Sequence, residues 1–195
     1  MNSKALCENY DLYFEEIILS NYLIKEILQR IKKINLPDWY LGAGCIAQTI
    51  WNYLHGYDLN KNINDYDVVY FDRSDLSFNS ENKTIQKINN VFKDLPVKLD
   101  IKNQARVHLW YEEHFGYSIN SYENINDAIN TWPTTATCIG VKITNGKFLY
   151  YSTFGLNDIF NMVVKPNKVQ ITKEIYENKT KRWEKCWPML KILEW

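Results

Sequence analysis

The chain of 195 residues is long enough for one domain with a substantial core. Its 23 lysines and arginines equal its 23 aspartates and glutamates, so charge does not indicate a nucleic-acid partner. Apolar residues make up 46% of the sequence, which argues against a disordered chain.

The four cysteines, Cys7, Cys45, Cys138 and Cys186, are widely spaced and form no Cys-x-x-Cys pair. This spacing argues against a zinc site and a disulfide framework, and it favours free thiols in a reducing compartment. No signal peptide, lipidation motif or long apolar span is visible. We therefore expect a soluble, cytoplasmic protein without a membrane partner.

The first predicted element is an amphipathic helix. Apolar residues recur at helical spacing from about residue 11 to residue 33, and Pro37 follows. A helix lying on a membrane surface has the same pattern, but a helix that packs on a core is more common. We expect the second.

A strand, a glycine turn and a helix come next. Residues 38–41 are short and aromatic, Gly42-Ala43-Gly44 forms the turn, and residues 45–55 have helical spacing. After a polar loop, the apolar run 66–71 predicts a second strand.

The rest of the chain continues to alternate helices with strands. Helices are predicted over 77–95, 103–115, 121–131, 156–164 and 172–187, and strands over 97–101, 137–144 and 147–152. Asn145-Gly146 between the last two strands is a strong hairpin signal. Mixed elements of this kind indicate an α/β or α+β fold. We expect one domain over 1–195, with a core at about 38–167 between the N-terminal helix at about 11–33 and the C-terminal helix at about 172–187.

Two aspartates lie one residue apart at the start of the strand over 66–71. Alternate side chains of a strand share a face, so Asp65 and Asp67 can project side by side. Two adjacent carboxylates repel each other unless a cation lies between them, and Mg²⁺ prefers such oxygen ligands. Aspartate pairs also occur in ordinary turns and helix caps. The apolar run that follows places this pair on a rigid scaffold, which favours a metal site.

Other residues extend this candidate site. The Gly42-Ala43-Gly44 turn can aim backbone N–H groups at a phosphate, although many glycine turns serve close packing alone. Asp100 on a later strand either ligates a second metal ion or accepts a proton from an attacking hydroxyl. Lys102 and Arg106 can neutralise phosphate charge, although such side chains are more often solvated or structurally paired.

These motifs together resemble the nucleotidyltransferase superfamily, whose signature is a glycine turn followed by Asp-x-Asp/Glu and a later strand carboxylate. More closely, the sequence is similar to a bacterial nucleotidyltransferase-like family formerly classed as a domain of unknown function. The resemblance covers about residues 40–167. It is carried by the runs 42–44, 49–51, 64–72, 102–108, 110–111, 131–137, 155–158 and 165–167.

The resemblance implies a mixed β-sheet flanked by helices, with a polymerase-β-like core, a nucleoside triphosphate as partner and Mg²⁺ as cofactor, with Mn²⁺ as its alternative. We predict transfer of a nucleoside monophosphate unit to an unidentified acceptor hydroxyl. The alternative is a non-catalytic nucleotide- or protein-binding module with a regulatory or antitoxin-like role. An RNA-modifying enzyme that stacks bases on its aromatic surface is a third, weaker reading. The candidate metal-binding and catalytic residues are Asp65, Asp67 and Asp100, and the candidate nucleotide-binding residues are Gly42, Ala43, Gly44, Lys102 and Arg106.

Overall fold

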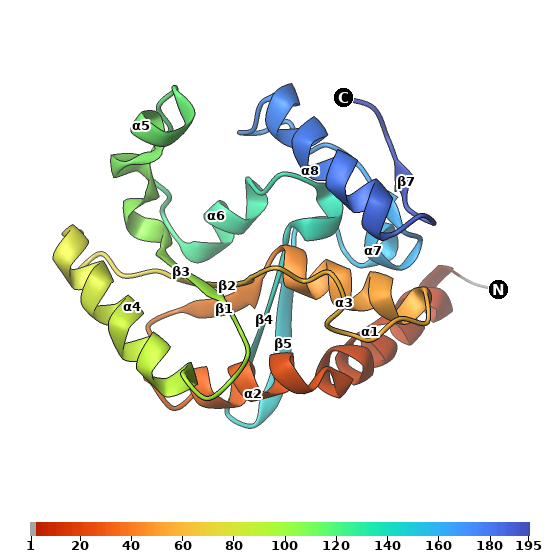
Figure 1. The fold of residues 1–195 in the computed structure, drawn as a ribbon, viewed down its shortest axis with the longest axis horizontal. Helices are drawn as coiled ribbons and strands as arrows, with labels where there is room; N and C mark the ends of the chain where they lie inside the picture. Colours follow the sequence, from red (N-terminus) through yellow and green to blue (C-terminus); the bar gives the residue numbers. More distant parts are fainter. Residues whose placement is uncertain (1–2) are drawn as a thin grey trace.

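The fold is built on a mixed β-sheet with helices on both faces (Figure 1). The computed structural model describes residues 3–195, with side chains from Tyr10 onward. Within this part of the chain, five strands lie in the order β3-β2-β1-β4-β5, in which β2 and β3 are parallel and the other neighbours antiparallel. Their bounds are β1 (Trp39–Gly42), β2 (Tyr66–Tyr70), β3 (Leu99–Asn103), β4 (Ile139–Thr144) and β5 (Lys147–Ser152). The predicted fold class is confirmed.

The two faces of the sheet have different partners because strand side chains alternate. Leu41 and Val68 belong to the main core, which also contains residues of α2 (Tyr22–Ile31) and α4 (Phe78–Phe92). Tyr40 and Val69 point the other way and pack against α6 (Ile125–Asn130). Figure 1 shows α2 and α4 on one side of the sheet and α6 on the other.

The N-terminal helix is interrupted. One helix over 11–33 was predicted, but the structure has α1 (Ser3–Ser20) and α2, with Asn21 between them. The Asn21 side chain accepts hydrogen bonds from the N–H groups of Leu23 and Ile24, and therefore caps α2. The prediction of one continuous helix is wrong because this capping bond starts a new helix within an unbroken apolar pattern.

The C-terminal helix is anchored on the helix that follows the glycine turn. These helices are α8 (Lys173–Cys186) and α3 (Gly44–Leu54). The Trp51 ring lies 5.4 Å from the Trp183 ring and 5.5 Å from the Trp187 ring, centroid to centroid. The indole N–H of Trp187 also donates to Asn52 Oδ1 over 2.7 Å. This packing fixes the C-terminal part of α8 beside the C-terminal part of α3.

Other predicted helices differ in their type or extent. The predicted helix over 103–115 is a 3₁₀ helix, η1 (Gln104–Leu109), followed by α5 (Tyr111–Phe115). The segment 156–164 contains α7 (Asn157–Phe160) and then β6 (Val163–Val164), which pairs in parallel with β7 (Lys191–Ile192). Met162, with a φ of 54°, separates α7 from β6. A second 3₁₀ helix, η2 (Thr135–Thr137), precedes β4.

The cysteine side chains that the structure describes are free thiols: Cys45 and Cys138 are buried and Cys186 is partly buried. Burial raises the pKa of Cys45 well above its usual value and raises the pKa of Cys138 to about 12. Both thiols therefore stay protonated and act as packing groups. The Cys7 side chain lies outside the described set. Across the described residues, no helix has the length and apolar character needed to cross a membrane.

Candidate functional site

A cleft of about 550 Å³ lies between α5 and α8. Figure 1 shows these two helices facing each other across the molecule. The walls carry three kinds of side chain, from β2, β3, η1, α5 and α8 and from the segments near them. They are the acidic Asp65, Asp67 and Asp100, the basic Lys102, Lys179 and Arg182, and the aromatic Trp110, Tyr111, Phe115, Tyr122, Trp132 and Trp183.

The carboxylates reach the cleft through the pairing of β2 with β3. The parallel register places Asp67 directly opposite Asp100, and Asp65 precedes Asp67 by two residues. Burial raises the pKa of Asp67 to about 7, and the charges of Asp100 and Asp65 add to this effect. The positive charges of Lys102 and Lys179 act in the opposite direction. The negative charge of Asp67 is therefore unfavourable beside those of Asp65 and Asp100 unless a cation binds near them.

The three carboxylates line one cleft but do not close into a three-ligand set. Among the described residues, no group of three His, Cys, Asp or Glu side chains is placed to hold a metal ion. Asp100 instead forms an ion pair with Lys102, which shares its face of β3. Asp65 and Asp67 fit a hard divalent cation, because Mg²⁺ is usually held by one or two carboxylates together with water and phosphate oxygens. The role of Asp100 as a metal ligand stays a prediction.

The glycine turn presents the N-terminus of α3 to the cleft. Ala43 and Gly44 line the cleft. Ala43 has φ 58° and ψ −129°, a conformation that disfavours side chains, and its N–H donates to Ile139 O over 2.9 Å. It provides no side-chain cap, so the first N–H groups of α3 have no acceptor from that residue. Such a terminus favours an anion.

Gly42 serves close packing. A Cβ atom on Gly42 would lie 2.7 Å from the Trp132 ring and 2.8 Å from Ile139 O. Gly42 does not line the cleft, whereas Trp132 does. Gly42 therefore leaves space for the Trp132 ring, whereas Ala43 and Gly44 line the cleft.

Gln48 was not predicted as a site residue. It lies in the second turn of α3, is 4% exposed and lines the cleft. Its side-chain nitrogen lies 2.9 Å from the position that a Cβ on Gly44 would take, which places the amide beside the start of α3. No described residue forms a hydrogen bond with this amide. A single glutamine within an apolar helix carries no sequence signal for such a role.

The C-terminal helix supplies one face of the cleft. Its lining residues follow the i, i+3, i+4, i+7, i+8 spacing of a single helix face: Ile175, Asn178, Lys179, Arg182 and Trp183. The sequence predicted this C-terminal helix but gave it no role in the site. The signal that could have marked it is the position of Lys179 and Arg182 on the same face as Trp183.

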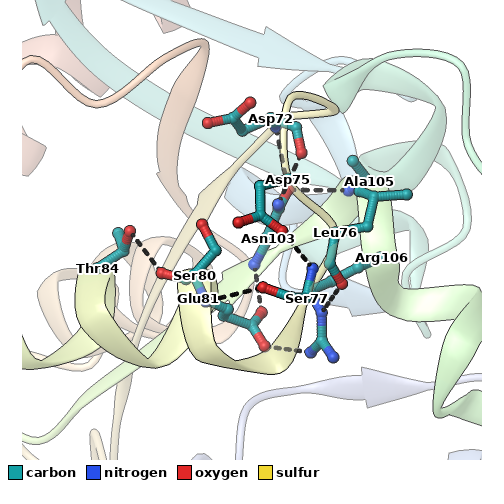
Figure 2. Close-up of polar contacts among 10 residues, drawn as sticks. All are labelled: Asp72, Asp75, Leu76, Ser77, Ser80, Glu81, Thr84, Asn103, Ala105 and Arg106. Atoms are coloured by element: carbon teal, nitrogen blue, oxygen red, sulfur yellow. Dashed lines mark hydrogen bonds and ion pairs between the residues drawn. The ribbon is translucent and has the colours of Figure 1, made fainter.

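Arg106 lies outside the cleft. Its guanidinium forms a buried ion pair with Glu81 of α4, and its Nε–H donates to Leu76 O over 3.1 Å (Figure 2). Glu81 also accepts the N–H of Asn103 over 2.8 Å. The structure brings Lys102 to the cleft but places Arg106 in this network, which joins η1 to α4. Arg106 is therefore structurally paired, which the sequence analysis gave as the alternative to a phosphate contact.

The part of the cleft formed by η1, α5 and the segment around Trp132 is rich in rings. The Tyr122 hydroxyl contacts Thr131 and Gln170, while the Tyr111 hydroxyl contacts Tyr117. Gln104 lines this part, is 5% exposed and has no hydrogen-bond partner for its side chain in the described region. This half therefore offers flat apolar surfaces with one free amide, which suits a planar ligand.

Comparisons with known proteins agree with this geometry. Residues 29–192 match the sequence model of a family described as Nucleotidyltransferase. The fold is similar to a solved structure titled "The NMR structure of the protein reveals a CCA-adding enzyme head domain". The TM-score is 0.73 and the identity 24%, over 100% of this chain and 97% of that chain, so this likeness shows the fold alone. No curated protein matches the chain significantly in sequence.

Proposed function

The chain belongs to the nucleotidyltransferase family, as its motifs predicted, and on this premise we propose that it transfers a nucleoside monophosphate unit from a nucleoside triphosphate to an acceptor hydroxyl with Mg²⁺ as cofactor. The observation that carries the proposal is the meeting of two features in one cleft. They are the uncapped start of α3 and the carboxylates of Asp65, Asp67 and Asp100.

Asp65 and Asp67 would hold the metal ion, for which Mn²⁺ is the alternative. When bound, a divalent ion supplies charge neutralisation for the triphosphate and a fixed position for its oxygens. The raised pKa of Asp67 supports this assignment, because burial first and the neighbouring carboxylates second disfavour its negative charge without a cation.

The chain's own residues orient the substrates. The free N–H groups at the start of α3, from Gly44 onward, face the phosphates, and Lys102 offsets part of the phosphates' negative charge. Asp100 either completes the ligand set or accepts the proton of the acceptor hydroxyl as its oxygen bonds to the α-phosphorus and pyrophosphate leaves. The aromatic rings of the cleft offer flat surfaces on which the base of the nucleotide can stack.

Isothermal titration with Mg·NTP tests the site. We expect the Asp65→Asn/Asp67→Asn variant to lose most of the Mg²⁺-dependent affinity. The matched control is Glu15→Gln/Glu16→Gln, which removes two negative charges from the exposed face of α1 and should bind as wild type does. If the aspartate variant binds Mg·NTP as tightly as wild type does, the proposed site is refuted.

One observation favours a second candidate function, a nucleotide-binding module without catalysis. The Asp100 carboxylate is paired with Lys102 rather than joined to Asp65 and Asp67. Pyrophosphate release from NTP in the presence of a pool of small alcohols, peptides and RNA ends separates the two functions. Release that Asp100→Asn abolishes while NTP binding persists supports catalysis, whereas full binding without release supports the module.

A further inference from the structure

We propose that Gln48, Lys179 and Arg182 form a binding site for a phosphate chain at the N-terminus of α3. The inference rests on the proposed function, because the triphosphate of an NTP is the first such ligand to consider. It assigns a direct role in the site to the C-terminal helix, which lies outside the motifs that carry the family resemblance.

The first support is the free amide beside the start of α3. An 11-residue helix begins at Gly44 without a side-chain cap, and its N-terminus faces the cleft. Gln48 lies at the same place, buried, and without a hydrogen-bond partner among the residues described. The amide therefore reaches the cleft wall without a protein partner, and a polar group in such a place is normally satisfied by a ligand or by water. Its N–H₂ group and the helix N–H groups are all donors for one anion.

The second support is the pair of cations on α8. Lys179 and Arg182 line the cleft, and neither forms an ion pair with a residue in the described part of the chain. By contrast, Lys173 on the same helix pairs with Glu177. Lys179 lies near enough to Asp67 for its charge to act on that carboxylate. The tryptophan contacts pack α8 on α3, and both cations line the same cleft as Ala43, Gly44 and Gln48.

The donors point to phosphate as the ligand class. An ammonium, a guanidinium, an amide and helix N–H groups together offer many donors, and each phosphate presents several acceptor oxygens. Arginine can bind such oxygens in a bidentate manner, and lysine acts as a point charge. The phosphate chain has two possible sources, the triphosphate of an NTP or the backbone of a nucleic-acid acceptor.

Titrations with sodium tripolyphosphate, ATP and a five-nucleotide RNA, each with and without Mg²⁺, test the site. In the Lys179→Gln/Arg182→Gln variant we expect the affinity for tripolyphosphate and for ATP to fall by about tenfold or more, since each charged hydrogen bond contributes roughly that factor. The control is Lys181→Gln/Lys185→Gln, which removes the same charge from exposed positions of α8 that do not line the cleft. It should change both affinities by less than about twofold, because surface charges act weakly.

A second variant tests the amide. Gln48→Met keeps the volume of the side chain, and circular dichroism checks that the fold is retained. We expect this variant to lose affinity for tripolyphosphate by several fold.

The Lys179→Gln/Arg182→Gln variant identifies the source of the phosphate chain. A loss of affinity confined to RNA assigns the site to the acceptor backbone, and a loss confined to tripolyphosphate and ATP assigns it to the nucleotide.

The results also separate the two proposals. If wild type binds ATP and the Lys179→Gln/Arg182→Gln variant binds tripolyphosphate, ATP and RNA as the control does, the phosphate site is refuted while the proposed function stands. If wild type binds no NTP but its tripolyphosphate affinity depends on the α8 pair, the proposed function fails and the anion site remains.

Discussion

The buried ion pair between Arg106 and Glu81 tests whether Arg106 serves the fold or a ligand (Figure 2). In an Arg106→Met variant, Glu81 keeps the Asn103 N–H as a donor but loses its cation. The two side chains are 10% and 8% exposed, so little solvent can replace the guanidinium. Removing one partner of a buried pair costs about 3–5 kcal/mol, and we expect about 3 kcal/mol here because the Asn103 bond remains.

Urea unfolding followed by circular dichroism measures this loss. With a slope of about 2 kcal/mol per molar urea, the midpoint should fall by roughly 1.5 M. The Glu81→Gln/Arg106→Met variant should recover part of the loss, because it leaves no unpaired buried charge. The control is Arg30→Met, whose ion pairs with Glu26 and Asp94 are more exposed, and its midpoint should fall much less than that of Arg106→Met. An Arg106→Met variant with an unchanged midpoint and a weakened affinity for NTP would refute the structural role and restore the predicted nucleotide contact.

Three further variants test local features by the same unfolding assay. Ala43→Gly should stabilise the fold by about 1 kcal/mol, because glycine relieves the positive φ at a smaller entropic cost. Gly42→Ala should destabilise it by about 1–3 kcal/mol, since the new methyl group meets the Trp132 ring at 2.7 Å. Asn21→Ala should cost about 1–2 kcal/mol, because it removes the cap of α2 and a buried bond to Thr49. No change for any of them would contradict the corresponding local argument.

The positions of the strands and of most helices along the chain could be predicted because their signals are local. The apolar run over 66–71 marked β2, and Asn145-Gly146 marked the hairpin between β4 and β5. The predictions failed where a capping or left-handed residue overrode the apolar spacing. Asn21 divides the N-terminal helix in this way, and Met162 leads from α7 into β6.

The candidate site could be predicted only in part, because part of it depends on tertiary packing. Asp65 and Asp67 share a face by strand geometry alone, whereas Asp67 meets Asp100 through a parallel register that no local pattern specifies. Lys179 reaches the cleft because tryptophans far apart in the sequence pack α8 on α3. Arg106 is close to Lys102 in the sequence, but η1 turns it toward α4.

The geometry of the turn links the strain at Ala43 to the direction of α3. The Trp132 ring occupies the space above Gly42, and the Ala43 N–H is held by Ile139 O, so the chain leaves β1 along a path determined by both contacts. That path requires the positive φ of Ala43, and α3 begins at the next residue with its N–H groups toward the cleft. Strained backbone persists only where its surroundings over-determine it, and it is often found where a ligand binds. Close packing at Gly42 therefore sets the direction in which the start of α3 faces the cleft.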